Sequence, residues 1–417
     1  MIQSIRGTKD ILPLEIKNWQ YIENAFKVIS ERFGYEEIRT PIFEKTEVFS
    51  RGIGEDTDVV NKEMYTFADR SGDSMTLRPE NTAAIVRSLL QNKLLNQNPL
   101  ARLWYFGPFF RYERPQKGRQ RQFHQYGAEC IGTNNPESDA EMILLAQHLI
   151  NYLGISDFKI LLNTLGDSES RANYKNALVG YFSDYSKDLS EDSQKRLLTN
   201  PLRILDSKNK NDIDISENAP KILDHLNEQS REHFEQVKQF LDETHVYYEI
   251  NPNLVRGLDY YSHTVFEFQS SMLGAQDSFG GGGRYNHLFE QLGGKQTPAI
   301  GFAMGVERIL LILEQQNLLA LDIEKPDAYV VTANKELIST SLKIASELRM
   351  IGRIVLMDLF QKSMKAQLRE ANKSNARNVI IIGEDELRSG NVTIKLMETG
   401  EQSEVPLSDI SKYFSKS

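Results

Sequence analysis

Extended apolar segments that come mostly in neighbouring pairs, rather than in alternation with helices, constrain the fold of this chain most. Segments of this kind lie at residues 103–112, 123–131, 158–162, 255–268 and 277–285. They are too many for a helical bundle, and their order along the chain favours antiparallel pairing. We therefore predict an α+β fold in which a mainly antiparallel sheet is flanked by helices.

The helices predicted beside this sheet carry apolar residues at spacings of three and four. The first has a stripe that ends before Gly34 and consists of Ile16, Trp19, Ile22, Phe26, Ile29 and Phe33. Such a stripe packs one face of a helix against a sheet. Two further helices are predicted at residues 82–95 and 137–153.

The composition changes twice along the chain and predicts its domain boundaries. Residues 171–250 are polar, so we predict a helical insertion that divides the sheet domain into residues 1–170 and 251–324. Over residues 325–417, strand-like segments such as DAYVVTA and NVIIIGE alternate with helical ones. This alternation is typical of a small α/β domain with a parallel sheet.

The composition favours a soluble protein, because 40% of the 417 residues are apolar and 26% are charged. No run approaches the roughly 18 consecutive apolar residues of a membrane span, and the first ten residues lack the apolar region of a secretory signal. One cysteine, Cys130, excludes an internal disulfide, and the seven histidines show no metal-ligand spacing. We expect a cytoplasmic protein with no membrane partner and no metal held by side chains alone.

The net charge of −9 requires that any contact with nucleic acid use a local basic patch. One patch lies at residues 111–121, where five basic residues accompany the single acid Glu113. The second, here called the basic stripe, recurs at spacings of three and four and consists of Lys362, Lys365, Arg369, Lys373 and Arg377. By itself the stripe fits a solvated helix face as well as an RNA-binding face.

The sequence lacks the common motifs of phosphate-binding loops, dinucleotide-binding folds and serine hydrolases. Instead, two arginines lie within segments predicted as strands. Arg111 lies in GPFFRYE and Arg256 in LVRGLDYY. A buried guanidinium is costly unless a carboxylate or phosphate meets it, so a phosphorylated ligand would suit both.

Strand parity in FHQYGAEC places Phe123, Gln125 and Glu129 on one face. This row suits either a cationic amine or imidazole ligand or a solvent-facing polar edge. The four glycines of GGGGRYNHL likewise suit either the close approach of a flat group to the backbone or a bulge.

Seven segments stand in a defined order: IRGTKDILP, IRTPIFEKTEVFSRGIGEDTDVV with Pro41, TLRPENT, FRYERPQKGRQRQFHQYGAE, LVRGLDYY, GGGGRYNHL and IGFAMGVERIL. In this order they resemble the motifs of histidyl-tRNA synthetases, a family of class II aminoacyl-tRNA synthetases. LVRGLDYY is the part that is similar to the histidine-specific segment, whereas the arginines of the second and third class motifs identify only the class. The last domain resembles an anticodon-binding module.

The resemblance implies a class II synthetase-like sheet and an ATP-dependent ligase. The enzyme would activate L-histidine to histidyl-adenylate and transfer it to the terminal ribose of tRNA(His). ATP would be a substrate and bring Mg²⁺ with it, since this cation prefers phosphate oxygens and water. A cytoplasmic homodimer formed through the first motif is implied as well. The basic stripe would contact the RNA backbone, and the loop at residues 115–121 would contact the acceptor end.

The resemblance also assigns residues to histidine, namely Glu80, Asn81, Thr82, Arg111, Gln125, Glu129, Arg256, Tyr260 and Tyr261. Glu80, Thr82 and Gln125 would hold the α-amino group, which is a cation that needs a carboxylate and neutral acceptors. Glu129 and Tyr261 would bracket the imidazole. A site that pairs both ring nitrogens leaves buried polar groups unsatisfied when a wrong side chain enters.

For ATP, the residues that the resemblance implies are Arg111, Glu113, Arg119, Phe123 and Arg308. Phe123 would stack on adenine, and Glu113 would approach the adenine or the magnesium ion. The implied catalytic residues are Arg256, Arg111 and Arg119. Their cations would stabilise the charge that develops on the phosphates.

The chain departs from the family pattern at few positions. Asn81 stands where glycine is expected, and Ser262 and His263 follow the two tyrosines where asparagine and a basic residue are common. Two other interpretations remain open. A non-catalytic regulatory paralogue of histidine biosynthesis typically lacks active-site residues and the last domain, and a pure RNA-binding protein leaves the set of Glu80, Gln125 and Glu129 unexplained.

Overall fold

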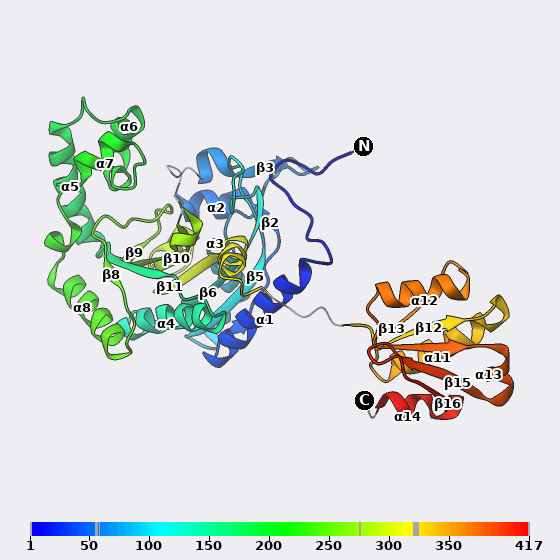
Figure 1. The fold of residues 1–417 in the computed structure, drawn as a ribbon. Helices are drawn as coiled ribbons and strands as arrows, with labels where there is room; N and C mark the ends of the chain where they lie inside the picture. The colour runs from blue at the N-terminus through cyan, green and yellow to red at the C-terminus, as the bar shows by residue number, and fades with distance from the viewer. Residues whose placement is uncertain (1, 55–56, 58, 275–276, 320–324, 416–417) are drawn as a thin grey trace. The chain divides into compact units, whose positions relative to one another are not determined.

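The computed structural model describes residues 2–54, 57, 59–274, 277–319 and 325–415. The chain divides into two compact units, Met1–Ala320 and Leu321–Ser417 (Figure 1). A search of the described residues finds no helix with the length and apolar character needed to cross a membrane.

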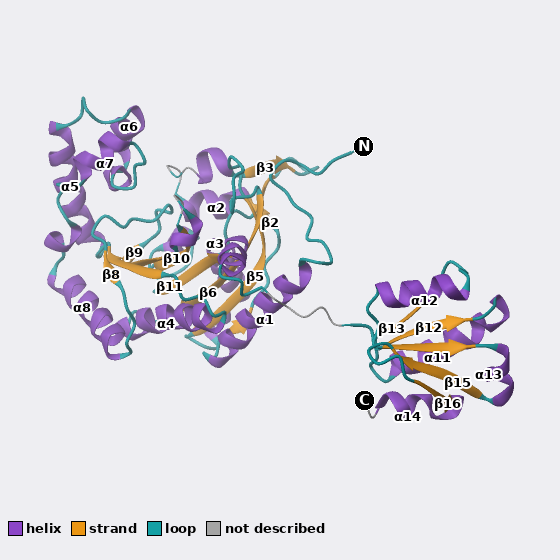
Figure 2. Cartoon of the chain, in the orientation of Figure 1, coloured by secondary structure: helices purple, strands orange, loops and turns teal. Residues whose placement is uncertain are grey.

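An eight-stranded sheet lies at the centre of the first unit, in the order β1-β5-β6-β11-β10-β9-β7-β8 (Figure 2). Its strands are β1 (Glu36–Glu37), β5 (Ala101–Phe110), β6 (Gln122–Ile131), β7 (Lys159–Thr164), β8 (Glu249–Ile250), β9 (Ser262–Gln269), β10 (Ser278–Arg284) and β11 (Ala299–Gly305). The edge strands β1 and β8 pair parallel with β5 and β7, and the pairs between them are antiparallel. The predicted fold class is confirmed.

The short edge strands β1 and β8 were not predicted, and the central part of the sheet differs from the sequence prediction at two places. The strand predicted over residues 255–268 begins only at Ser262, because residues 251–261 form an irregular segment that carries Arg256. Strand β11 was not expected, since its glycines weaken the pattern of a strand. Gly301 is needed there because a Cβ atom at this position would lie 1.6 Å from Oε2 of Glu129 on the neighbouring strand β6.

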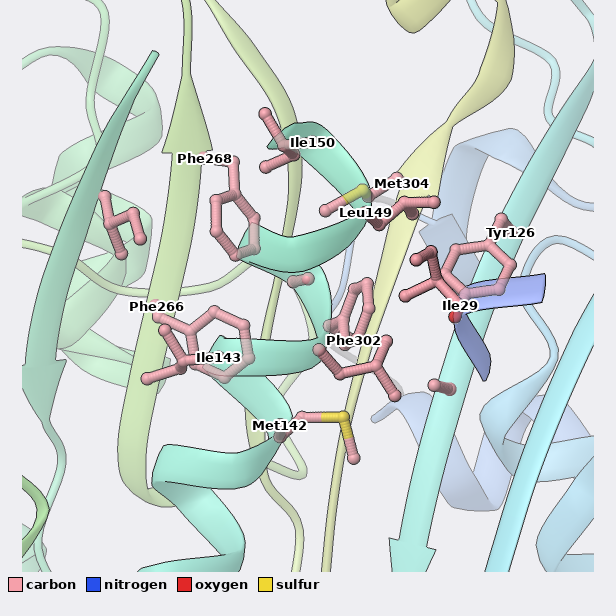
Figure 3. Packing of buried hydrophobic residues seen from close by; sticks show 14 of the residues in the cluster. Ile29, Tyr126, Met142, Ile143, Leu149, Ile150, Phe266, Phe268, Phe302 and Met304 are labelled. Carbon is pink, nitrogen blue, oxygen red and sulfur yellow. The ribbon is translucent and has the colours of Figure 1, made fainter. Parts of the chain in front are cut away.

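Helices cover both faces of the sheet, and each face has its own core. On one face α1 (Ile16–Arg32), α4 (Pro136–Tyr152) and α10 (Val306–Gln315) pack on the sheet. The predicted stripe of α1 is buried there from Trp19 to Ile29, with Phe26 stacked on Tyr126 at 4.3 Å between ring centroids. Figure 3 shows Ile143 and Leu149 of α4 packed with Phe302 and other side chains of the same core.

The opposite face is covered by α3 (Thr82–Asn92), α9 (Leu288–Gln291) and part of the insertion. Next to them, α2 (Thr46–Ile53) packs on α3. A small sheet in the order β2-β4-β3 adjoins α2 and consists of β2 (Phe43–Lys45), β4 (Ser74–Leu77) and β3 (Tyr65–Ala68).

The predicted polar insertion is helical. It contains α5 (Ser168–Asp184), α6 (Glu191–Thr199), the 3₁₀ turn η3 (Pro201–Ile204), α7 (Lys210–Ser216) and α8 (Glu228–Glu243). Its first helix begins at Ser168, where the Asp167 carboxylate accepts a hydrogen bond from the Ser170 backbone at 2.8 Å and so caps the helix. Its last residues form the edge strand β8.

The second unit is an α/β domain with one five-stranded sheet in the order β13-β12-β14-β15-β16. The strands are β12 (Ala328–Thr332), β13 (Val355–Met357), β14 (Asn378–Ile382), β15 (Asn391–Leu396) and β16 (Gln402–Pro406), and the helices are α11 (Ile338–Met350), α12 (Met364–Lys373), α13 (Glu384–Ser389) and α14 (Ile410–Ser415). The first three strands are parallel as predicted, whereas β15 and β16 add an antiparallel hairpin.

A fully buried ion pair ties α4 to the central sheet. Asp139 and Arg284 have no exposed side-chain surface, and their charged atoms lie 2.6 Å apart. His233 of α8 and Thr264 of β9 also bind the Asp139 carboxylate, at 2.8 and 2.6 Å. Burial alone would raise the pKa of Asp139, but the Arg284 guanidinium and these hydrogen bonds hold it below its ordinary value. One carboxylate thus joins four elements of the first unit.

We predict that Arg284→Ala lowers the free energy of unfolding of the first unit by about 3–5 kcal/mol, because the Asp139 charge remains buried without its partner. Urea unfolding followed by tryptophan fluorescence measures this unit, since both tryptophans, Trp19 and Trp104, belong to it. The control is Lys27→Ala, which removes one cation from an exposed pair with Glu31. An equal and small effect of both changes would contradict the role of the buried pair.

Candidate active site

A cavity of about 500 Å³ opens over the face of the central sheet that carries α3. Its walls come from β6, β9, β10 and β11, the start of α3, the loop after β5 and the irregular segment at residues 251–261. The predicted site residues that line it are Glu80, Thr82, Arg111, Glu113, Arg119, Phe123, Gln125, Arg256, Tyr260, Tyr261 and Arg308. Segments far apart in the sequence therefore meet at one site.

Glu80 is buried at the N-terminal end of α3. Its carboxylate accepts hydrogen bonds from the backbone amides of Thr82 at 2.6 Å and Ala83 at 3.0 Å. Burial raises the pKa of Glu80, and these two bonds oppose the rise because they favour the ionised form. The helix end therefore orients a carboxylate toward the cavity, where a cationic group of a ligand would meet it.

Asn81, the residue that departs from the family pattern, does not line the cavity. Its side-chain oxygen accepts a hydrogen bond from the Thr40 hydroxyl at 2.6 Å, and its side-chain nitrogen has no partner among the described residues. The amide is 1% exposed, so it lies behind the wall of the site. It connects α3 to the segment before β2.

Glu129 also lies behind the wall, with 1% of its surface exposed. Its carboxyl group accepts hydrogen bonds from Thr82 at 2.9 Å and from the Tyr285 hydroxyl at 2.6 Å. Burial raises the pKa of Glu129 to about 8. The group therefore changes its charge near neutral pH, directly behind two side chains that line the cavity.

Arg256 forms an ion pair with Glu267 of β9. Burial alone would lower the pKa of Arg256, but the Glu267 carboxylate raises it above its ordinary value. The guanidinium lies against Gly281, where a Cβ atom would come within 2.9 Å of Nη1. Gly281 of the glycine run therefore allows a flat group to lie close to the backbone, and this group is the guanidinium of Arg256.

Other arginines of the cavity have contacts that hold them in place. Arg111 donates from Nε to the Pro79 carbonyl at 3.0 Å, and its guanidinium carbon lies 5.4 Å from the centre of the Phe123 ring. Arg119 pairs with Glu113 at 3.0 Å. Burial and the charge of Arg119 both lower the pKa of Arg308. Cations gathered this closely in a partly buried cavity favour a polyanionic ligand.

Several lining residues were missed by the sequence prediction, namely Tyr105, Asp206, Lys208, Glu267 and Tyr285. Strand parity could have predicted Glu267, because this residue alternates with the core residues Phe266 and Phe268. Asp206 and Lys208 carry no such signal, since they belong to the polar insertion. In the part of the chain that the structure describes, no three His, Cys, Asp or Glu side chains are placed to hold a metal ion.

The chain matches two family models. The model described as histidyl-tRNA synthetase matches residues 7–309, and the model described as anticodon binding domain matches residues 327–417. Among curated proteins, the histidine–tRNA ligase of Cyanothece sp. (strain PCC 7425) is 48% identical over 98% of this chain and 95% of its own length. The histidine–tRNA ligase of Geobacillus sp. (strain WCH70) is also 48% identical, over 98% of this chain and 97% of its own.

Solved structures show the same similarity. The apo histidyl-tRNA synthetase of S. aureus has a TM-score of 0.84 and 40% sequence identity, and the match covers 99% of this chain and 100% of that one. The histidyl-tRNA synthetase of Nostoc sp. PCC 7120 has a TM-score of 0.66 and 21% identity, with 100% and 99% of the two chains covered. At this lower identity the likeness concerns the fold.

We predict that Glu129→Gln changes how stability depends on pH in the absence of ligand. The raised pKa means that Glu129 binds its proton more tightly in the folded state, so its contribution to stability is lost as pH rises from about 4.5 to 8. The free energy of unfolding of the variant should therefore rise relative to that of the wild type by about 1 kcal/mol per pH unit in this range.

Urea unfolding of both proteins at pH 5, 6, 7 and 8 measures the difference. A further comparison at pH 9 serves as the control, because the difference should be constant above the folded-state pKa. A difference that stays constant from pH 5 to 8 would show that Glu129 is ionised throughout.

Proposed function

The chain belongs to the histidyl-tRNA synthetase family, and from this premise we propose how its cavity binds the substrates of an ATP-dependent ligase. The reaction activates L-histidine with ATP and joins it to tRNA(His). The observation that carries the assignment is the convergence of two sets of residues on one cavity. One is the carboxyl group of Glu80 with that of Glu129 behind it, and the other is a group of arginines.

Histidine would bind at the carboxyl groups. Glu80, with Thr82 and Gln125, would accept hydrogen bonds from the α-amino group. Gln125 supports this role because its side-chain oxygen is buried without a partner among the described residues. We assign Glu129 and Tyr261 to the two sides of the imidazole. Tyr261 lines the cavity, whereas Glu129 would act from behind the wall, through the Thr82 and Tyr285 side chains that it binds.

ATP would bind at the arginines. Phe123 would stack on adenine, and Arg119 and Arg308 would bind the outer phosphates. Arg111 and Arg256 would face the α-phosphate that the histidine carboxylate attacks. Their positions are held before substrate arrives, by the Pro79 carbonyl for Arg111 and by Glu267 for Arg256. Preorganised cations of this kind stabilise charge in a transition state.

Magnesium would enter with ATP. Glu113 lines the cavity and is assigned to the adenine or to this ion. It is paired with Arg119, and no second acid joins it in a ligand set among the described residues. One carboxylate with phosphate oxygens and water suits Mg²⁺. When bound, the ion supplies charge neutralisation on the phosphates, while the side chains bind and orient them.

The reaction that follows from this arrangement needs little proton transfer from the protein. The histidine carboxylate attacks the α-phosphorus in line, histidyl-adenylate forms and pyrophosphate leaves. Positioning of the two substrates and stabilisation of charge account for most of such a step. In the second step, a hydroxyl of the terminal ribose attacks the adenylate carbonyl and releases AMP.

The second unit would bind the tRNA backbone through the basic stripe. Lys365, Arg369 and Lys373 recur every four residues on α12 and are exposed. Lys362 lies before this helix and contacts Glu370 at 3.5 Å, and Arg377 lies after it and contacts Asp327 at 3.8 Å. The three helical residues are therefore the ones most available to phosphates.

A homodimer would form through the region of the first motif. The small sheet beside α2 and the residue before it expose large apolar side chains, with 44% of Ile42, 51% of Phe43 and 45% of Phe67 accessible. An exposed cluster of this kind marks a protein contact surface. We assign the domains as predicted, with residues 1–170 and 251–324 as the catalytic domain, 171–250 as the insertion and 325–417 as the anticodon-binding domain. A cytoplasmic location agrees with this assignment.

The regulatory paralogue is the second candidate function, and the cavity argues against it. All the arginines and acids assigned to histidine and ATP are present, and six of these side chains line one cavity. The last domain is present too and matches the anticodon-binding model.

We predict that Arg256→Ala leaves the fold intact but lowers histidine-dependent ATP–pyrophosphate exchange at least about 100-fold, because the α-phosphate loses a fixed cation. Exchange of labelled pyrophosphate into ATP, with thermal unfolding in parallel, measures both properties. Arg231→Ala on the exposed side of α8 is the matched control. Near-normal turnover by Arg256→Ala would remove Arg256 from the catalytic residues.

We predict that the double change Lys365→Ala with Arg369→Ala weakens tRNA charging about tenfold but leaves histidine activation unchanged, because two phosphate contacts are lost. Charging with full-length tRNA(His) and pyrophosphate exchange separate the two steps. The control is Lys343→Ala with Arg388→Ala, which removes the same charge from other exposed positions of the second unit. If both reactions fall equally, or neither changes, the stripe does not bind tRNA.

A further inference from the structure

The polar insertion is anchored to the segment that carries Arg256 through one acidic residue, Asp259. Its Oδ1 atom accepts hydrogen bonds from Asn200 at 3.1 Å and from Nε and Nη2 of Arg203 at 3.3 and 3.2 Å. Nη2 of Arg203 also donates to the Gly257 carbonyl at 2.9 Å. Asn200 precedes η3 and Arg203 lies within it, so one short part of the insertion makes all these contacts.

A second arginine of the insertion strengthens the same anchor from α5. Nη1 of Arg171 donates to the carbonyl of Asp259 at 3.3 Å and to that of Tyr261 at 3.0 Å. Burial lowers the pKa of Arg171. On its other side, the backbone amide of Asp259 donates to the Ile53 carbonyl at the end of α2.

These contacts matter because residues 251–261 have no regular secondary structure apart from turns. A helix or strand would keep its shape through its own hydrogen bonds, whereas this segment takes its shape from what surrounds it. Arg256 stands three residues before Asp259, and its guanidinium is held by Glu267 against Gly281. The sheet thus holds the tip of Arg256, and the insertion holds the backbone beside it.

We propose that the Arg203–Asp259 pair positions Arg256 for adenylate formation, so that the insertion is required for the first step of the reaction even without tRNA. Arg203 and Asp259 are positioning residues, since neither lines the part of the cavity assigned to histidine or ATP. The pair is well shielded, with 13% of the Arg203 side chain and 25% of the Asp259 side chain exposed. This inference rests on the role proposed above for Arg256.

The same anchor sets a wall of the cavity. Asp206 and Lys208 follow Arg203 by three and five residues and line the cavity, and the charges of Asp206 and Arg256 interact. Because a displacement of about 1 Å at a catalytic group can cost about 100-fold in rate, loosening of this anchor is enough to slow the chemistry without removing any group that contacts substrate.

The test measures pyrophosphate exchange without tRNA in Arg203→Ala, Asp259→Asn and Arg203→Lys. We expect kcat to fall about tenfold or more in the first two, with the KM for ATP changed about twofold at most, because Arg256 acts on the transition state. Arg203→Lys should retain most of the activity, since an ammonium group still pairs with Asp259. Lys195→Ala on the exposed surface of α6 removes the same charge from the insertion and serves as the control.

A double-mutant cycle distinguishes positioning from an independent effect. In an Arg256→Ala background, Arg203→Ala should lower kcat less than about twofold further, because it acts through Arg256. An equal fall in both backgrounds would overturn the proposal. So would a normal kcat in folded Arg203→Ala and Asp259→Asn, or a loss of activity that a lower melting temperature explains fully. If Arg256→Ala itself has normal activity, the proposed role of Arg256 is wrong. The single variant alone shows this, so this outcome is distinct from a failure of the positioning role.

Discussion

A charge buried in the first unit must meet an opposite charge or several hydrogen bonds, and the architecture around the central sheet depends on this requirement. On one side Asp139 and Arg284 neutralise each other without any exposed surface. On the other, Glu80 is met by the backbone amides of α3 and Arg256 by Glu267. The pair of Asp139 and Arg284 joins α4 to β10, and the pair of Arg256 and Glu267 joins the irregular segment to β9. The contacts that make burial tolerable therefore also hold elements together around the sheet.

Glycines let these charged groups come close to the sheet. Gly301 leaves the space that the Glu129 carboxyl group occupies, and Gly281 leaves the space beside the Arg256 guanidinium. A side chain at either position would displace a group of the site rather than a group of the core. The glycine-rich strands β10 and β11 are therefore part of the site, although they look like weak strands in the sequence.

Much of the fold and of the site was predictable because it depends on local periodicity. The stripe of α1 and the alternation in β6 follow from the geometry of single elements, and both are as expected. The contributions of Tyr285, Asp206 and Lys208 were not predictable, because each depends on how an element packs after the chain has folded. The orientation of Asn81 was not predictable for the same reason, since its side-chain amide binds Thr40 behind the cavity wall.

The sequence by itself determined the fold class, the family and eleven of the residues that line the cavity, because these depend on patterns within short segments. Only the tertiary structure decided how the irregular segment at residues 251–261 is held and what the polar insertion contacts. Those properties arise from pairs such as Arg203 with Asp259, which are 56 residues apart in the chain. No local pattern encodes such a distance, so it becomes visible only when packing brings the two side chains together.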